Sequence, residues 1–107
     1  MNRLFASALL AVGLVAILEN ANAAQQHVAA MGKRFSPAEV RIPSKEMVIF
    51  INQDKVVHQV FSTTEGLRFN LKRLPPGAAS GVRFTKRGVA EVRCAIHRDM
   101  HMKVVVE

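Results

Sequence analysis

The amino-acid sequence predicts an all-β fold, a Greek-key β-sandwich of about seven to eight strands that follows a signal peptide. Apolar and polar residues alternate with the period of a strand in several short segments. Turn signals such as PSK, QDK, PPG and KRG separate these segments. After residue 23 the chain shows no convincing apolar repeat of 3.6 residues, so strands are expected there and helices are not.

Residues 1–23 have the composition of a secretory signal peptide. A basic start at Arg3 precedes an apolar run from Leu4 to Leu18, and the small-residue sequence ANA then ends at residue 23. The alternative is an uncleaved membrane anchor, but the run is shorter than the roughly 20 residues that a span needs. We therefore expect cleavage before Ala24, a periplasmic protein and no membrane insertion after cleavage.

Cleavage leaves one small domain, residues 24–107, with a single cysteine, Cys94. A lone cysteine cannot form a disulfide within the chain. In an exported protein it is an intermolecular crosslink, a liability or a ligand. We therefore expect the Cys94 thiol to be buried, bound to a metal, or both.

The chain carries a formal charge of +7 at pH 7, with 15 Lys and Arg against 8 Asp and Glu. These charges are spread through the domain and favour partners with an acidic surface. The chain lacks a basic motif interleaved with aromatic residues, so nucleic acid is not an expected partner. We expect a monomer.

The strand pattern differs from segment to segment. Ala38, Val40 and Ile42 alternate with charged residues, as in a half-buried strand. Val92 and Cys94 fall on one face of a later segment, which we expect to be the core face. Six of the expected strands can be placed, at residues 38–42, 46–52, 56–62, 81–85, 89–94 and 102–107.

The stretch CAIHRDMHMKVVVE, residues 94–107, gathers possible metal ligands at the end of a predicted strand. It contains Cys94, then His97 three residues later, then two methionines, while His58 lies on a predicted strand upstream. Each of these residues alone is more often structural than functional. Together, one thiolate, two imidazoles and a weak thioether are characteristic of a blue-copper electron-transfer site. We therefore predict one mononuclear copper ion as the cofactor.

The same stretch resembles the copper loop and last strand of the cupredoxins, closest to the amicyanins and related small methylamine-utilisation proteins. The resemblance continues back through FSPAEVRI, VIFINQDKVVHQVFS and FTKRGVAEVRC. It implies that His58, Cys94, His97 and a methionine bind copper. It also implies that Asn52, six residues before His58, ties the two ligand loops together.

Two methionines compete for the axial position. Met100 gives the spacing Cys-x-x-His-x-x-Met of amicyanin, whereas Met102 gives the longer loop of plastocyanin. In these relatives the axial methionine lies three residues before the lysine that begins the last strand, which is Lys103 in this chain. We therefore favour Met100, with Met102 as the alternative.

The loop departs from the amicyanin pattern. Ile96 and Arg98 stand where that family commonly has prolines, so the Ile96 N–H is free to donate a hydrogen bond to the Cys94 sulfur. Ala95 replaces a hydroxyl residue that often partners the asparagine, which puts the side-chain part of the Asn52 link in question. Arg98 and its polar neighbours are expected to make the rim of the site polar.

Three functions fit these observations. The first is a one-electron carrier that is not an enzyme and exchanges electrons with redox protein partners through the edge of His97. The second is a protein that buffers or delivers Cu(I), with His101 and Met102 as additional ligands at the rim. The third is an interaction module that works without metal.

Overall fold

The computed structural model describes residues 25–107, so the predicted signal peptide lies outside the described residues. Every regular element in this range is a β-strand, and none of the described residues forms a helix able to cross a membrane. The strands are β1 (Gln25–Met31), β2 (Arg34–Ser36), β3 (Glu39–Ile42), β4 (Met47–Asn52), β5 (Val60–Ser62), β6 (Phe69–Asn70), β7 (Ala79–Arg83), β8 (Gly88–Cys94) and β9 (His101–Val106).

The prediction of an all-β sandwich is confirmed, although the described residues form nine strands where seven to eight were expected. Two of the unexpected strands, β1 and β2, precede the first segment that the alternation pattern predicted. A third, β6, has only two residues and is defined by its pairing with β5. The predicted strand at 56–62 shortens to Val60–Ser62, and His58 forms only an isolated bridge with Leu74.

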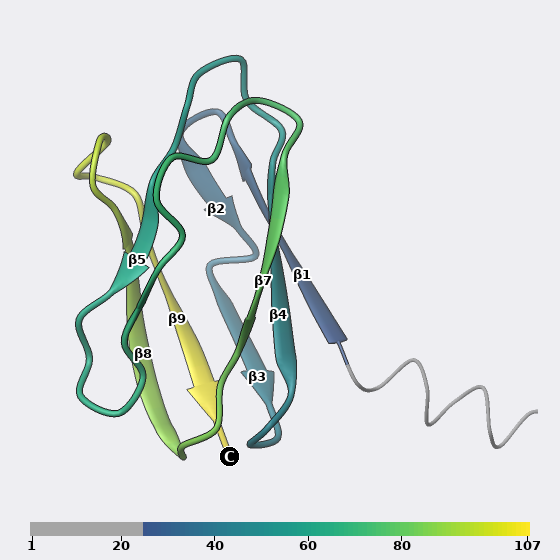
Figure 1. Cartoon of the computed structure of the whole chain (residues 1–107), viewed down its shortest axis with the longest axis vertical. Coiled ribbons are helices and arrows are strands. Elements are labelled where there is room, and N and C mark those ends of the chain that lie inside the picture. Colours follow the sequence, from purple (N-terminus) through teal and green to yellow (C-terminus); the bar gives the residue numbers. More distant parts are fainter. Residues whose placement is uncertain (1–24) are drawn as a thin grey trace, which may run out of the picture.

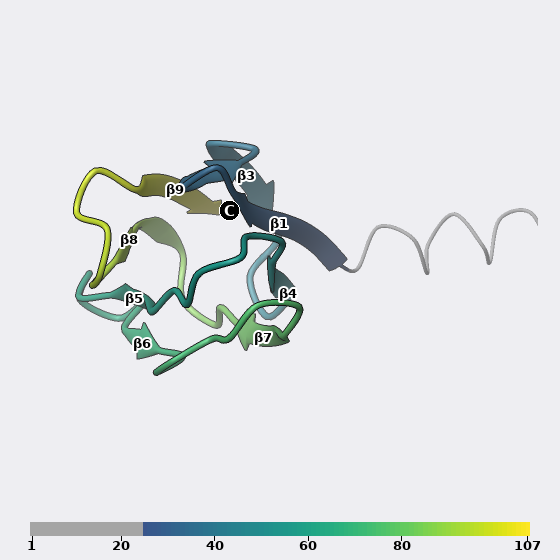
Figure 2. The ribbon, with the colours of Figure 1, turned by 90° about the horizontal axis from the view of Figure 1, so that it is seen from above.

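Two sheets face each other, as Figures 1 and 2 show from the side and from above. One has the order β2-β1-β4-β7 and the other the order β3-β9-β8-β5-β6. Closely spaced turns predict antiparallel pairing, but the sandwich is mixed. Strand β1 pairs in parallel with β4, and β3 pairs in parallel with β9.

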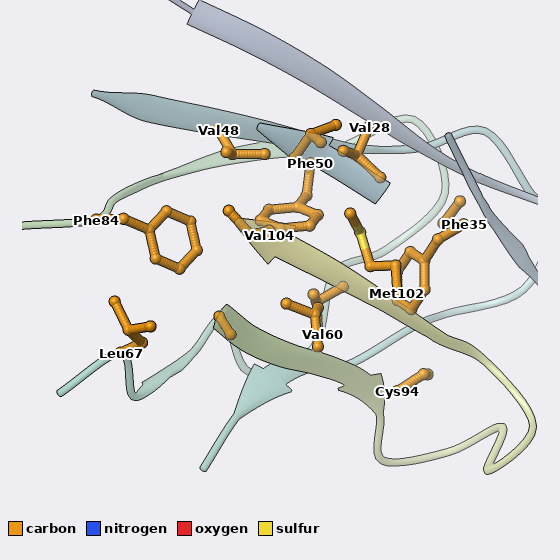
Figure 3. Close-up of a cluster of buried hydrophobic side chains, with 14 of the residues drawn as sticks. Val28, Phe35, Val48, Phe50, Val60, Leu67, Phe84, Cys94, Met102 and Val104 are labelled. Atoms are coloured by element: carbon orange, nitrogen blue, oxygen red, sulfur yellow. The ribbon is translucent and has the colours of Figure 1, made fainter. Parts of the chain in front are cut away.

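The core lies between the two sheets (Figure 3). Alternation along β4 directs Val48 and Phe50 inward, and alternation along β8 directs Val92 and Cys94 inward. The Phe50 ring stacks on Phe69, with the ring centroids 5.7 Å apart. Burying one such side chain stabilises the fold by about 1.5–3 kcal/mol, so this layer fixes the strand register.

Four loops meet at one end of the sandwich, the upper end in Figure 1. They are the β1–β2, β4–β5, β6–β7 and β8–β9 connections. The first is a two-residue turn in which Gly32 and Lys33 have φ of 61° and 56°. A type I′ hairpin turn needs this left-handed conformation at both positions, and glycine adopts it without strain.

Candidate metal centre

Three of the predicted ligands converge at the loop end of the sandwich. The Nδ1 atoms of His58 and His97 are 3.1 Å apart. The Cys94 Sγ lies 3.6 Å from Nδ1 of His58 and 3.7 Å from Nδ1 of His97. The structure therefore brings together donor atoms that are separated by up to 39 positions in the sequence.

This triangle has the size that a small metal ion requires. The point equidistant from its three corners lies about 2.0 Å from each donor atom, against metal–ligand distances of about 2.0–2.1 Å for imidazole nitrogen and 2.3 Å for thiolate sulfur. Two imidazoles and one thiolate in a trigonal arrangement are the equatorial ligands of a blue-copper site. The residues present thus fit copper in number, chemistry and spacing.

Cys94 and the following loop are held by backbone hydrogen bonds. Cys94 is the last residue of β8, on the core face, and is 2% exposed. Its N–H donates to the Met100 carbonyl at 3.3 Å, and the Met100 N–H donates to the His97 carbonyl at 3.0 Å. These bonds close the six-residue loop and place His97 beside the sulfur.

His58 is fully buried and its ring is fixed by a carboxylate. Its backbone exchanges two hydrogen bonds with Leu74, at 3.1 and 2.7 Å. Its Nε2 lies 2.7 Å from Oδ2 of Asp54. An ionised carboxylate only accepts, so Nε2 carries the proton and the unprotonated Nδ1 faces Cys94 and His97.

Asp54 is a site residue that sequence reasoning missed. Its Oδ1 accepts the Gly32 N–H at 2.6 Å and its Oδ2 accepts the Lys33 N–H at 3.0 Å. The pKa of this carboxyl is lowered by the Lys33 N–H first and then by the hydrogen bond with His58. The four-residue spacing from Asp54 to His58 was a signal, but an aspartate in a QDK turn is equally well explained as a turn former.

Asn52 is buried and fully hydrogen-bonded, but it does not join the two ligand loops as the resemblance implied. Its Nδ2 donates to the carbonyls of Val56 and Leu74, at 2.9 Å each, and its Oδ1 accepts the Asp54 N–H at 2.9 Å. Asn52 therefore ties the β4–β5 loop, which carries His58, to the β6–β7 connection. The prediction that Asn52 links this loop to the loop of Cys94 and His97 was therefore wrong.

Gln59 connects the two ligand-bearing segments instead. Its N–H donates to the Cys94 Sγ at 3.5 Å, and its carbonyl accepts the Ala95 N–H at 2.9 Å. The predicted donor, Ile96, makes no hydrogen bond to the sulfur within the part of the chain that the structure describes. Gln59 takes this role because β5 pairs with β8, which sets its backbone beside the sulfur.

The two methionines occupy different environments. Met100 ends the ligand loop, is 2% exposed, and shares a hollow of about 430 Å³ with His97. Met102 lies within β9 opposite Val92, is 1% exposed, and packs among the core side chains (Figure 3). The expectation that Met102 is an additional ligand at the rim is therefore wrong, because its side chain belongs to the core.

The surroundings of His97 favour its neutral form. Burial lowers the pKa of its imidazole, and the nearby His58 and Lys33 lower it further. A neutral imidazole is the form that binds a metal, so the site is suited to its proposed role before any metal enters.

The fold and the three donors define a cupredoxin-type metal centre. The family model of the cupredoxin-like domain matches residues 4–106, and the chain belongs to this family. The resemblance noted from the sequence is confirmed. Copper as the cofactor is likewise confirmed by the family and by the arrangement of the donors.

Solved structures with the same fold include an amicyanin, a purple cupredoxin and part of a copper-containing nitrite reductase. Amicyanin from Paracoccus versutus (Thiobacillus versutus) has a TM-score of 0.72 and 23% identity, covering 78% of this chain and 81% of that one. A purple cupredoxin from Nitrosopumilus maritimus has a TM-score of 0.69 and 23% identity, covering 77% and 99%.

A copper-containing nitrite reductase from Thermus scotoductus SA-01 has a TM-score of 0.72 and 24% identity, covering 78% of this chain. The chain spans only 22% of the length of that enzyme. No curated protein matches the chain at a significant level. At these identities the likeness establishes the fold.

Proposed function

We propose that the protein is a periplasmic one-electron carrier whose copper is held by His58, Cys94, His97 and Met100. Bound copper supplies the one-electron couple between Cu(II) and Cu(I). The observation that carries the proposal is the triangle of three donor atoms, whose equidistant point lies about 2.0 Å from each, within a cupredoxin-like fold.

The frame around the ligands suits rapid electron exchange. Cys94 is fixed at the end of β8, and the His58 ring is fixed by Asp54. Ligands that are already in place need little rearrangement when the charge of the metal changes, because the surrounding core is close-packed. Among the three equatorial donors, the half-buried His97 is the least covered, so its ring edge is the route for the electron.

Met100 is the proposed axial ligand. It directly follows the His97 turn, and its backbone carbonyl is hydrogen-bonded to the Cys94 N–H, so its position is tied to that of the thiolate. Both methionines are buried, and Met100 is the one that lines the hollow beside His97. A weak axial thioether tunes the reduction potential of such a site.

We propose that the protein acts with other redox proteins, as a monomer, rather than as an enzyme on its own. The nitrite reductase neighbour is a much longer chain, and the present chain corresponds to only a fraction of it.

Export of the present protein to the periplasm would follow from the signal peptide predicted at residues 1–23. Cell fractionation with N-terminal sequencing tests this, and the expected mature chain begins at Ala24.

Optical and EPR spectroscopy after Cu(II) addition, together with voltammetry, test the carrier function. We expect an intense visible thiolate-to-Cu(II) band, one copper per chain and a reversible couple. Cys94→Ser should abolish the visible band, because the charge transfer needs the thiolate, whereas Ser62→Ala on β5 should retain it. An intense band in Cys94→Ser would show that the ligand assignment is wrong.

A further inference from the structure

Building on the proposed carrier function, we propose that the surface around His97 is a docking face for an acidic redox protein. We define the docking face as the hollow beside His97 and its rim, in which Lys33, Arg34 and Arg98 supply the positive charge. In this arrangement the carboxylates of the partner meet the three cations, and its redox centre lies against the edge of His97.

The hollow itself brings the cations to the proposed electron route. It has a volume of about 430 Å³, and its three cationic side chains come from two separate loops and β2. All three are exposed, and one acid, Asp99, accompanies them. Its lining residues are Lys33, Arg34, His97, Arg98, Asp99 and Met100.

The side chains of the loops at the metal end sum to +3, against +1 for those at the opposite end when Glu107 is included. The four loops at the metal end carry Lys33, Lys55, Lys72, Arg73 and Arg98 against Asp54 and Asp99. The Asp54 carboxylate is already occupied by His58 and two backbone N–H groups. The connections at the opposite end carry Lys45, Arg68, Lys86 and Arg87 against Glu46 and Glu65, and the chain ends there at Glu107.

Lys33 is held in place by the metal site. Its backbone has φ of 56° and donates its N–H to Asp54, the residue that fixes His58. Lys33 and His97 line the same hollow, so the lysine charge lies beside that ring. A negative group that binds Lys33 would therefore lie next to the electron route.

Apolar residues adjoin these cations. A second hollow, of about 470 Å³, shares Lys33 with the first and is also lined by Met31 and Val56. Met31 is 58% exposed and Val56 is 40% exposed, and Ile96 in the ligand loop is 43% exposed. Arg98 and Asp99 make part of the rim polar as expected, but exposed apolar residues lie beside them. A specific protein interface needs apolar contact beside its charges, and this end of the chain offers both.

The physical role of the charge is to steer and orient the partner. Complementary charges raise the association rate and fix the orientation of the encounter, and salt weakens this effect. Arg98 can also bind a carboxylate through two parallel hydrogen bonds, because its guanidinium is a planar fork. Since Arg98 adjoins His97 in the sequence, a carboxylate bound there sets the distance between the partner and the metal.

Stopped-flow oxidation of the Cu(I) protein by small reagents tests the charge. Hexacyanoferrate(III) is an anionic oxidant and tris(phenanthroline)cobalt(III) a cationic one, and each takes one electron from the protein. At low ionic strength we expect Arg98→Gln and Lys33→Gln each to slow the anionic reagent about threefold and to speed the cationic one. Arg87→Gln, the same charge change in the loop between β7 and β8 at the far end, should alter either rate much less.

Titration of the isotopically labelled Cu(I) protein with a hexaglutamate peptide tests the partner class by NMR. We expect amide shifts confined to residues 31–34 and 96–101, weakened in Arg98→Gln. Binding at this face by phosphatidylglycerol vesicles but not by the peptide would overturn the proposal in favour of a membrane contact. Equal effects of Arg98→Gln and Arg87→Gln on the rates would also overturn it. So would a substitution that changes the rates of the anionic and the cationic reagent in the same direction. Electron transfer to either reagent would still support the carrier function, so the two proposals fail separately.

Discussion

At the scale of single residues, Asp54 shows how a side chain outside the ligand set shapes the site. Its carboxylate accepts hydrogen bonds from Gly32 and Lys33 and faces Nε2 of His58 at 2.7 Å. One acid therefore fixes both a strained turn and the imidazole tautomer. Such partners of metal-binding histidines commonly raise ligand basicity and restrict the orientation of the ring.

We predict that Asp54→Ala lowers copper affinity by about 10- to 100-fold, which is the usual effect of removing the hydrogen-bond partner of a metal-binding histidine. The His58 ring loses its acceptor and can rotate or change tautomer. Competition titration with a chelator of known affinity measures the change. Asp99→Ala is the matched control, because it makes the same change at an exposed acid. Equal losses in the two variants would mean that general negative charge, and not the contact with His58, is responsible.

At the scale of strands, the register of β9 separates the two methionines. Met102 pairs with Val92 and faces the core, while Met100 lies one residue before the strand. A period of two residues sets only the direction of a side chain, so both methionines fit the alternation. The family spacing counted back from Lys103 favours Met100, and the hollow that Met100 shares with His97 gives a physical reason for the same choice.

We predict that Met100→Leu shifts the reduction potential and the visible spectrum, because the axial ligand tunes both. Met102→Leu should leave them nearly unchanged and alter stability by less than about 1.5 kcal/mol, as volume-conserving core substitutions usually do. Voltammetry and denaturant unfolding of both variants measure these effects. The opposite pattern would assign the axial position to Met102.

The parts of the fold predicted from sequence were those whose residues alternate strongly. The strands β3, β4, β8 and β9 lie within two residues of their predicted bounds, because each carries large apolar residues on one face. In β1 one of the inward residues is only an alanine, Ala30, and its pairing with β4 is parallel and distant in sequence. No local pattern encodes such a pairing.

The metal site could also be predicted only where the local sequence carries a signal. The three converging donors were found because sulfur and imidazole ligands are rare and their spacing is informative. The hydrogen bonds of Asp54 and Gln59 were missed, since they depend on how the loops meet in space. The sulfur contact in particular uses a backbone N–H, and every residue except proline has one.

At the scale of the whole molecule, most of the buried core lies outside the proposed metal site. Within residues 25–107, 18 apolar residues are buried, and only Cys94 and Met100 among them are proposed ligands. In the same range no buried side-chain nitrogen or oxygen lacks a hydrogen-bond partner. The sandwich thus has its own core, unlike small domains that fold only around a metal.

We therefore predict that the copper-free protein unfolds in a single cooperative transition and that copper only adds stability. A ligand that binds the folded state alone stabilises it by about 2.7 kcal/mol at a free concentration 100 times Kd. Calorimetry with and without Cu(I) measures this shift, and Cys94→Ser should lose most of it. Hydrogen exchange should show added protection mainly in residues 52–59 and 94–100, because these segments carry the proposed ligands and their hydrogen bonds. A copper-free protein without a cooperative transition, or protection gained throughout both sheets, would show instead that the metal organises the fold.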